Sequence, residues 1–109
     1  MVRTVRIKDV PRIAKLINGY AKKGIMLPKS LNRLYEELHN FTVVEENKKL
    51  VGCGALHVIW EDLGEIRSIA VKKSHQKKGL GSELMYHLLQ KAVEMEISKI
   101  FVLTLQPKQ

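Results

Sequence analysis

The segment Glu65–Leu84 constrains the possible folds of this sequence more than any other part. Polar and apolar residues alternate up to Val71 and predict a strand, with Ile66, Ser68 and Ala70 on one face. A basic stretch, Lys72 to Lys78, follows, and a helical pattern then begins at Gly79-Leu80-Gly81. Its apolar positions are Leu80, Leu84, Leu88, Ala92 and Met95. This order of strand, basic loop and helix favours an α/β protein.

The start of this predicted helix has the features of a phosphate-binding site. The first backbone N–H groups of a helix have no intrahelical partner, and the helix dipole is positive at that end. Gly79 and Gly81 remove Cβ atoms where an oxygen would approach the backbone, and four lysines add positive charge: Lys72, Lys73, Lys77 and Lys78. The spacing matches neither the dinucleotide fingerprint nor a Walker loop. We therefore expect a pyrophosphate to bind here; the alternative is a solvated lysine-rich turn.

The N-terminal third predicts a strand followed by two helices. Val2, Val5 and Ile7 alternate with basic residues as in a strand. Asp9 is expected to cap a helix with an apolar face at Ile13, Leu16 and Ile17. Ser30 is expected to cap a shorter helix in which Leu31, Leu34, Tyr35 and Leu38 form one face, with Glu36 and Glu37 turned outward.

The remaining segments predict a mixed sheet. Phe41–Glu46 and Lys49–Trp60 are rich in β-branched and aromatic residues and predict a hairpin. Lys99–Leu105 is expected to form a last strand. Cys53 is expected as a small buried side chain, and His57 as a surface or core residue of its strand, with substrate contact as the alternative.

Composition narrows the class of protein. A length of 109 residues indicates one domain, 1–109, and the net charge of +8 indicates an anionic partner. One cysteine and four histidines show no metal-ligand spacing, and no apolar stretch is long enough for a membrane span or a signal peptide. We expect a cytoplasmic protein without a metal. A nucleic-acid binder is a rival, but the basic block lacks interleaved aromatic residues, so no specific nucleic acid is expected.

The pattern Gln76-x-x-Gly79-x-Gly81, preceded by a strand ending at Val71, resembles the acetyl-CoA-binding signature of the GNAT acetyltransferase superfamily. Four further segments resemble the short prokaryotic N-acetylglutamate synthases of arginine biosynthesis within it: Leu27–Ser30, Val51–Leu56, Glu65–Ser68 and Thr104–Pro107. The resemblance implies an α/β (α+β) acyl-CoA N-acyltransferase fold, with a mixed, mostly antiparallel sheet flanked by helices. It also implies acetyl-CoA as cosubstrate.

The resemblance implies particular cofactor contacts. The backbone of Ile69, Ala70 and Val71 would pair with the pantetheine amides like an added strand. The pyrophosphate would lie over the amides of Gln76, Lys77, Lys78, Gly79, Leu80, Gly81 and Ser82.

The resemblance further implies direct transfer of the acetyl group to the α-amino group of an amino acid, L-glutamate. Glu65 would receive the amine proton through water, and Arg67 would pair with a substrate carboxylate. Leu27, Lys29 and Ser30 would shape the acceptor pocket; the alternative is that Leu27–Ser30 is an ordinary connection. An ion pair of Arg67 with Glu65 or with another acidic residue is the alternative for Arg67. The rival functions are acetylation of another amine or of a protein lysine, and CoA binding without catalysis.

The sequence departs from the GNAT pattern at its end. The family continues with a helix and two more strands, whereas this sequence stops at Gln109. We therefore expect a C-terminally incomplete domain in which Ile100, Val102 and Leu103 lose part of their cover. Such an edge would favour self-association, for example as a homodimer.

Overall fold

The computed structural model describes residues 1–24 and 26–102. They form a sheet with strand order β1-β2-β3-β4-β5, antiparallel except for the parallel pair β4–β5. The strands are β1 (Val2–Thr4), β2 (Phe41–Glu46), β3 (Lys49–Trp60), β4 (Leu63–Val71) and β5 (Lys99–Val102). The helices are α1 (Val10–Ala21), α2 (Leu31–Glu36) and α3 (Leu80–Glu94), with short 3-10 turns at Ile7–Asp9, Leu38–Asn40 and Lys73–His75. The expected mixed sheet is thus confirmed.

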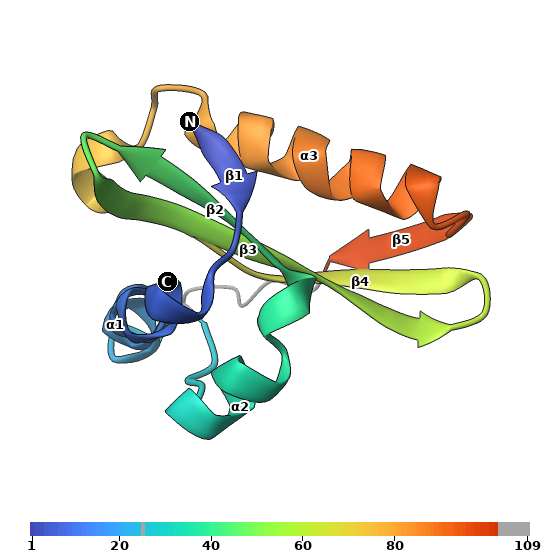
Figure 1. Ribbon diagram of the computed structural model, residues 1–109, viewed down its shortest axis with the longest axis horizontal. Coiled ribbons are helices and arrows are strands. Elements are labelled where there is room, and N and C mark those ends of the chain that lie inside the picture. Colours follow the sequence, from blue (N-terminus) through green and yellow to red (C-terminus); the bar gives the residue numbers. More distant parts are fainter. Residues whose placement is uncertain (25, 103–109) are drawn as a thin grey trace.

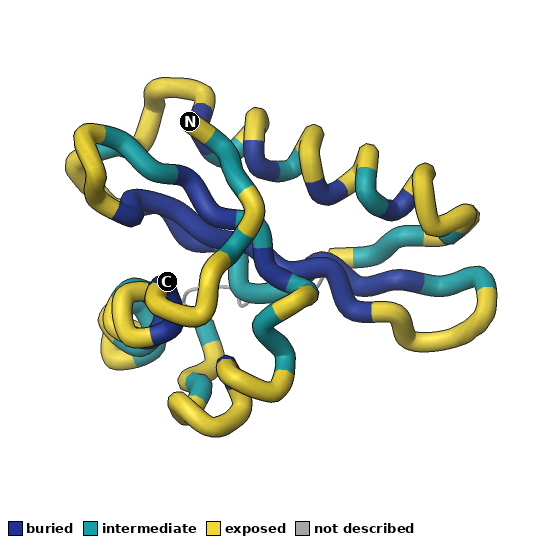
Figure 2. The backbone as a smooth tube through the Cα atoms, viewed as in Figure 1, coloured by how far each residue is buried: buried dark blue, intermediate teal, exposed yellow. Residues whose placement is uncertain are grey.

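Helices cover both faces of the sheet (Figure 1). On one face, α1 and α2 pack through buried residues that include Ile13, Ile17 and Leu34. On the other, Leu84 and Leu88 of α3 are fully buried against the strands. Figure 2 shows the buried backbone concentrated in the middle strands, between these two helical layers.

Some local expectations for α2 and α3 are wrong. In α2 only Leu34 is buried, while Leu31 and Tyr35 are about half exposed. Glu37 points inward to an ion pair instead of outward to solvent. In α3 the apolar face is buried as expected up to Ala92, but the helix ends at Glu94 and Met95 is 51% exposed.

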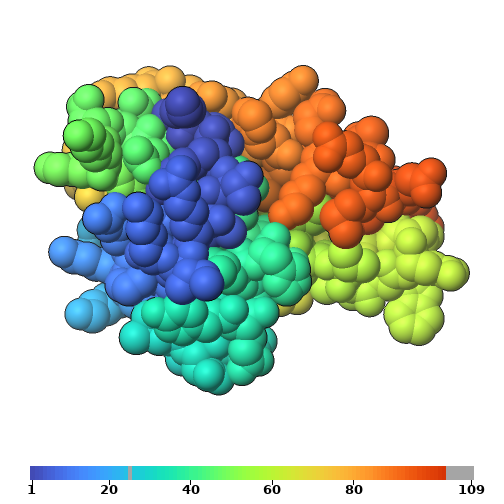
Figure 3. Space-filling view, in the orientation of Figure 1, coloured from blue at the N-terminus to red at the C-terminus, as the bar shows by residue number. Residues whose placement is uncertain are grey.

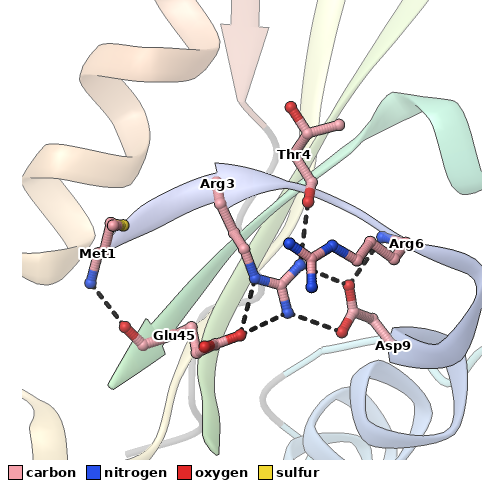
Figure 4. Close-up of polar contacts among 6 residues, drawn as sticks. All are labelled: Met1, Arg3, Thr4, Arg6, Asp9 and Glu45. Carbon is pink, nitrogen blue, oxygen red and sulfur yellow. Dashed lines mark hydrogen bonds and ion pairs between the residues drawn. The ribbon is translucent and has the colours of Figure 1, made fainter. Parts of the chain in front are cut away.

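The first strand is shorter than the alternating pattern predicts, because an ion-pair network ends it (Figure 4). Arg3 places its Nη1 and Nη2 atoms 2.8 and 2.9 Å from the two carboxylate oxygens of Asp9, and its Nε 2.8 Å from Glu45. Asp9 also accepts the Arg6 N–H at 2.7 Å and is completely buried. Asp9 therefore precedes α1 without capping it, and its carboxylate joins β1 and β2 to the start of the helix instead.

A bulge changes the faces of β4. Ser68 has a φ of +57°, and the register with β3 shifts between Cys53 and Ala55. As a result Ile66 packs on the α3 side and Ala70 on the α1 side. The predicted alternation, with both residues on one face, is wrong because the bulge inserts one residue into the period of two.

No helix in residues 1–24 and 26–102 combines the length and the hydropathy needed to cross a membrane. Within the same residues no group of three or more histidine, cysteine and acidic side chains is placed to hold a metal ion.

Candidate functional site

The loop between β4 and α3 exposes the start of a long helix. Gly79 precedes α3 with a φ of +81°, and no side chain in residues 1–24 and 26–102 caps the helix N-terminus. A Cβ atom built on Gly81 would meet no protein atom within 4 Å. The glycine at position 81 is therefore not required by packing within the described chain, and the space above it is open to a ligand. Lys77 and Lys78 are exposed beside this position.

Gln76 has a structural role that the sequence did not reveal. Its Nε2 donates to the Val71 carbonyl at 3.0 Å and to the Tyr20 hydroxyl at 2.8 Å. The Tyr20 hydroxyl donates to the same carbonyl at 2.5 Å. These bonds join α1, the end of β4 and the loop before α3. Tyr20 was not among the predicted site residues, and no motif distinguishes it from an ordinary residue of an amphipathic helix.

The three residues predicted to pair with pantetheine, Ile69, Ala70 and Val71, differ in the direction of their backbone N–H and carbonyl groups. The Lys72 N–H donates to the Val51 carbonyl on β3. Because backbone groups alternate in direction along a strand, the N–H and carbonyl of Ala70 also point toward β3. Those of Ile69 and Val71 point away from β3, toward the outer edge. In the described residues β5 pairs with β4 only from Leu63 to Ile66. An extended ligand could therefore pair with Ile69 and with the Val71 N–H, whereas the Val71 carbonyl already has its partners.

Three of the predicted site residues, Glu65, Arg67 and Lys29, contribute to one polar cluster around His57 on the α2 side of the sheet. Glu65 is 6% exposed and accepts the Arg67 Nε–H at 2.5 Å, so the structure contains the ion pair considered as the alternative for Arg67. His57 on β3 lies directly opposite Glu65 in the strand register. The other carboxylate oxygen of Glu65 and the Nη groups of Arg67 form no hydrogen bond within the described part of the chain, and neither residue has a further ion-pair partner there.

Lys29 reaches the cluster from the segment before α2. Its Nζ lies 2.7 Å from Glu37, and the Asn18 side chain holds its backbone N–H and carbonyl, both at 2.9 Å. Burial acts most strongly on Glu37 and would raise its pKa, but the hydrogen bond from Lys29 and the positive charges nearby together outweigh burial, so the pKa is lowered. Ser30 caps α2 by accepting the Arg33 N–H, which is a structural role, and Leu27 is 73% exposed.

His57 is a buried and neutral member of the cluster. Its Nδ1 is 3.3 Å from the Asn40 amide nitrogen, and its buried Nε2 has no hydrogen-bond partner among the residues that the structure describes. Burial, with a further contribution from the Arg67 charge, lowers the pKa of His57 to about 4. Because Asn40 donates to Nδ1, the proton of the neutral ring resides on Nε2. The ring therefore presents one unsatisfied donor.

Cys53 is a structural residue. It is completely buried in β3, and burial raises the pKa of its thiol to about 12. A thiol in this environment is a poor nucleophile, as the sequence led us to expect.

A model of the acetyltransferase (GNAT) family matches residues 13–109. The chain therefore belongs to this family. An amino-acid acetyltransferase from Mycobacterium tuberculosis is 45% identical over 109 residues, which cover 97% of this chain and 62% of that protein.

Solved structures agree with this family membership. A Mycobacterium tuberculosis protein in complex with CoA superposes with a TM-score of 0.91 at 45% identity, over 97% of this chain and 65% of that one. N-acetylglutamate synthase from Neisseria gonorrhoeae, complexed with coenzyme A and N-acetyl-glutamate, gives a TM-score of 0.92 at 34% identity. This second match covers 95% of our chain and 25% of the synthase. The expected acyl-CoA N-acyltransferase fold is confirmed, and the chain spans less than two thirds of these relatives.

Proposed function

We propose that this chain binds acetyl-CoA and transfers its acetyl group to the α-amino group of an amino acid, L-glutamate. The observation that carries the proposal is the uncapped start of α3, with open space at Gly81, next to the Ile69–Val71 end of β4, where the outer edge has no strand partner in the described residues. The first feature suits a pyrophosphate and the second an extended chain with amides. The relatives solved with CoA support this assignment.

The polar cluster supplies groups suited to the transfer. The amine nitrogen would attack the thioester carbonyl, the new C–N bond would form, and the C–S bond would break to release the CoA thiolate. Glu65 would take the amine proton through one water, because only one of its oxygens accepts from Arg67. The thiolate would then take up a proton from solvent. No covalent enzyme intermediate is required.

The preference for glutamate rests on the basic groups around Glu65. Arg67 uses its Nε toward Glu65, which leaves the Nη groups for a substrate carboxylate in paired geometry. Lys29 lies in the same cluster but is already bound to Glu37. We also propose a cytoplasmic location and an amino acid as the small-molecule partner; the homodimer expected from sequence stays a prediction.

Acetyl-CoA binding can be tested at Gly81. In Gly81→Val a side chain occupies the space where the pyrophosphate would approach, so we expect acetyl-CoA affinity to fall at least tenfold. Gly81→Ala is the matched control with a smaller side chain and a smaller expected loss. Because the added Cβ meets no protein atom, both variants should remain folded by circular dichroism. Equal affinity of the parent and Gly81→Val in calorimetry would contradict the assignment.

The acceptor can be tested with a panel of amines assayed by thiol release. Glutamate should be turned over faster than lysine or spermidine. Arg67→Lys keeps the charge but loses the paired geometry, so the KM for glutamate should rise about tenfold or more while acetyl-CoA affinity stays within twofold. Faster turnover of a polyamine, or unchanged glutamate kinetics in Arg67→Lys, would overturn the glutamate assignment. Acetyl-CoA binding without transfer to any amine would favour the non-catalytic alternative.

A further inference from the structure

A groove of about 490 Å³ lies between three segments that the proposed transfer does not explain. They are one face of α1, the β2–β3 turn with the start of β3, and the loop after β4. In Figure 3 α1 (blue) and the β2–β3 turn (green) lie next to each other at the left edge of the molecule. The half-buried Leu16 and Tyr20 and the buried Leu50 form its apolar inner wall.

The rim of this groove concentrates the positive charge of the protein. The lining contains no acidic residue and seven exposed basic ones: Arg12, Lys15, Lys23, Lys48, Lys49, Lys72 and Lys73. Subtracting these seven from the net charge of +8 leaves +1 for the rest of the sequence. None of them forms an ion pair with another residue in the described ranges. Like charges around one concave surface repel each other, and a bound polyanion would relieve this repulsion.

Gly19 is an independent indication that the groove is kept open. It lies inside α1, where glycine is less favourable than alanine, and it lines the groove. A Cβ atom at this position would meet no atom of the described residues within 4 Å, apart from its chain neighbours and the backbone of its own helix. Packing therefore does not require the glycine, whereas a longer side chain here would enter the groove.

We propose that this groove binds a nucleoside polyphosphate, with the phosphates between the lysines and the base against Leu16, Tyr20 and Leu50. The volume suits a small organic molecule, and an apolar wall with a cationic rim matches a ligand with one apolar and one anionic end. Two sources share this chemistry, a separate nucleotide and the nucleotide end of acetyl-CoA, and the proposal is the separate nucleotide, because the acetyl-CoA pyrophosphate is assigned to the start of α3. The nucleotide end of acetyl-CoA is tested as well, because Lys72 and Lys73 of the groove belong to the loop that leads to α3, where acetyl-CoA is proposed to bind. Binding in the groove does not depend on acetyl transfer.

Calorimetry with ATP at 150 mM salt tests the groove directly. The parent protein should bind ATP, and Lys15→Glu should weaken binding at least tenfold. Lys8→Glu is the matched control, because Lys8 is exposed but does not line the groove, and it should change the affinity less than threefold. No measurable binding at 1 mM ATP, or equal losses in both variants, would overturn the proposal. Inorganic triphosphate binding as tightly as ATP would overturn the nucleoside part.

Gly19 provides a test that separates loss of the groove from loss of the fold. Gly19→Leu should reduce ATP affinity at least tenfold while the melting temperature stays the same or rises, because leucine favours the helix. Gly19→Ala should keep ATP affinity within threefold. Unchanged ATP affinity in a folded Gly19→Leu variant would show that ATP binds elsewhere and would overturn the assignment.

Competition distinguishes the two sources. If ATP and acetyl-CoA bind together, the groove serves a separate nucleotide. If they exclude each other and Lys15→Glu weakens both, the groove holds the nucleotide end of acetyl-CoA. Only simultaneous binding supports the proposal; mutual exclusion with a loss of both affinities in Lys15→Glu would overturn it, because the groove would then be part of the acetyl-CoA site. Acetyl-CoA binding that is lost in Gly81→Val, together with no ATP binding, would overturn this inference while leaving the proposed function intact.

Discussion

At the scale of single residues, His57 carries a testable pH dependence. Its pKa is about 4 in the folded protein, below the ordinary value of 6.5, because the ring is buried. The unfolded chain therefore binds the proton more readily, and the stabilisation is complete above pH 6.5 and is lost as the pH falls toward 4. We expect a loss of about 2 to 3 kcal/mol in the free energy of unfolding over this window.

The control for this prediction is His57→Gln, which keeps a polar amide near Asn40 but does not titrate. Denaturant unfolding of both proteins at pH 7, 6 and 5 should show a steeper decline for the parent. Carboxylates without an interaction with His57, such as Asp9, affect both proteins equally, so the difference between the two curves reports His57 and its coupling to Glu37. Parallel curves for the two proteins would show that the ring is not held neutral by its surroundings.

At the scale of elements, the start of α3 contains two glycines with different physical roles. Gly79 needs its left-handed backbone, with a φ of +81°, whereas Gly81 is inside the helix with open space around it. Gly79→Ala should destabilise the protein by about 1 kcal/mol, because a Cβ atom is unfavourable in that conformation. Gly81→Ala should be neutral or stabilise it by up to about 1 kcal/mol, because alanine favours the helix.

Thermal unfolding of the two single variants, without ligand, checks this pair. Opposite shifts of the melting temperature would support the separation of roles, with glycine at 79 serving the backbone and glycine at 81 leaving room for a ligand. A clear loss of stability in Gly81→Ala would mean that the helix start is packed more tightly than the structure indicates.

At the scale of the whole molecule, the positive groove should make stability depend on salt. Lys15→Glu replaces one of seven neighbouring positive charges with a negative one. At low ionic strength this should raise the free energy of unfolding by about 0.5 kcal/mol, and the gain should shrink toward 0.5 M salt as the charges are screened. Urea unfolding at two salt concentrations measures both effects. Lys8→Glu should gain less, and an equal gain would show that the repulsion is not local to the groove.

Features encoded by neighbouring residues were predictable from the sequence. The turn between β2 and β3 has Asn47 and Lys48 at φ values of 51° and 64°, a local conformation compatible with the expected hairpin. The order of β4, basic loop and α3 follows from polarity patterns within a few residues of each other, and the GNAT signature lies inside it. Backbone preference and helical periodicity act over short distances, so they can be read from one segment at a time.

The tertiary structure alone decided which distant residues meet. The buried pairing of Arg3 with Asp9 and Glu45 shortens β1, and the bonds of Tyr20 and Gln76 to Val71 tie α1 to the end of β4. The groove likewise draws its charge from three segments that are far apart in the sequence. Such contacts depend on how the helices pack against the twisted, bulged sheet, and no local pattern specifies that geometry.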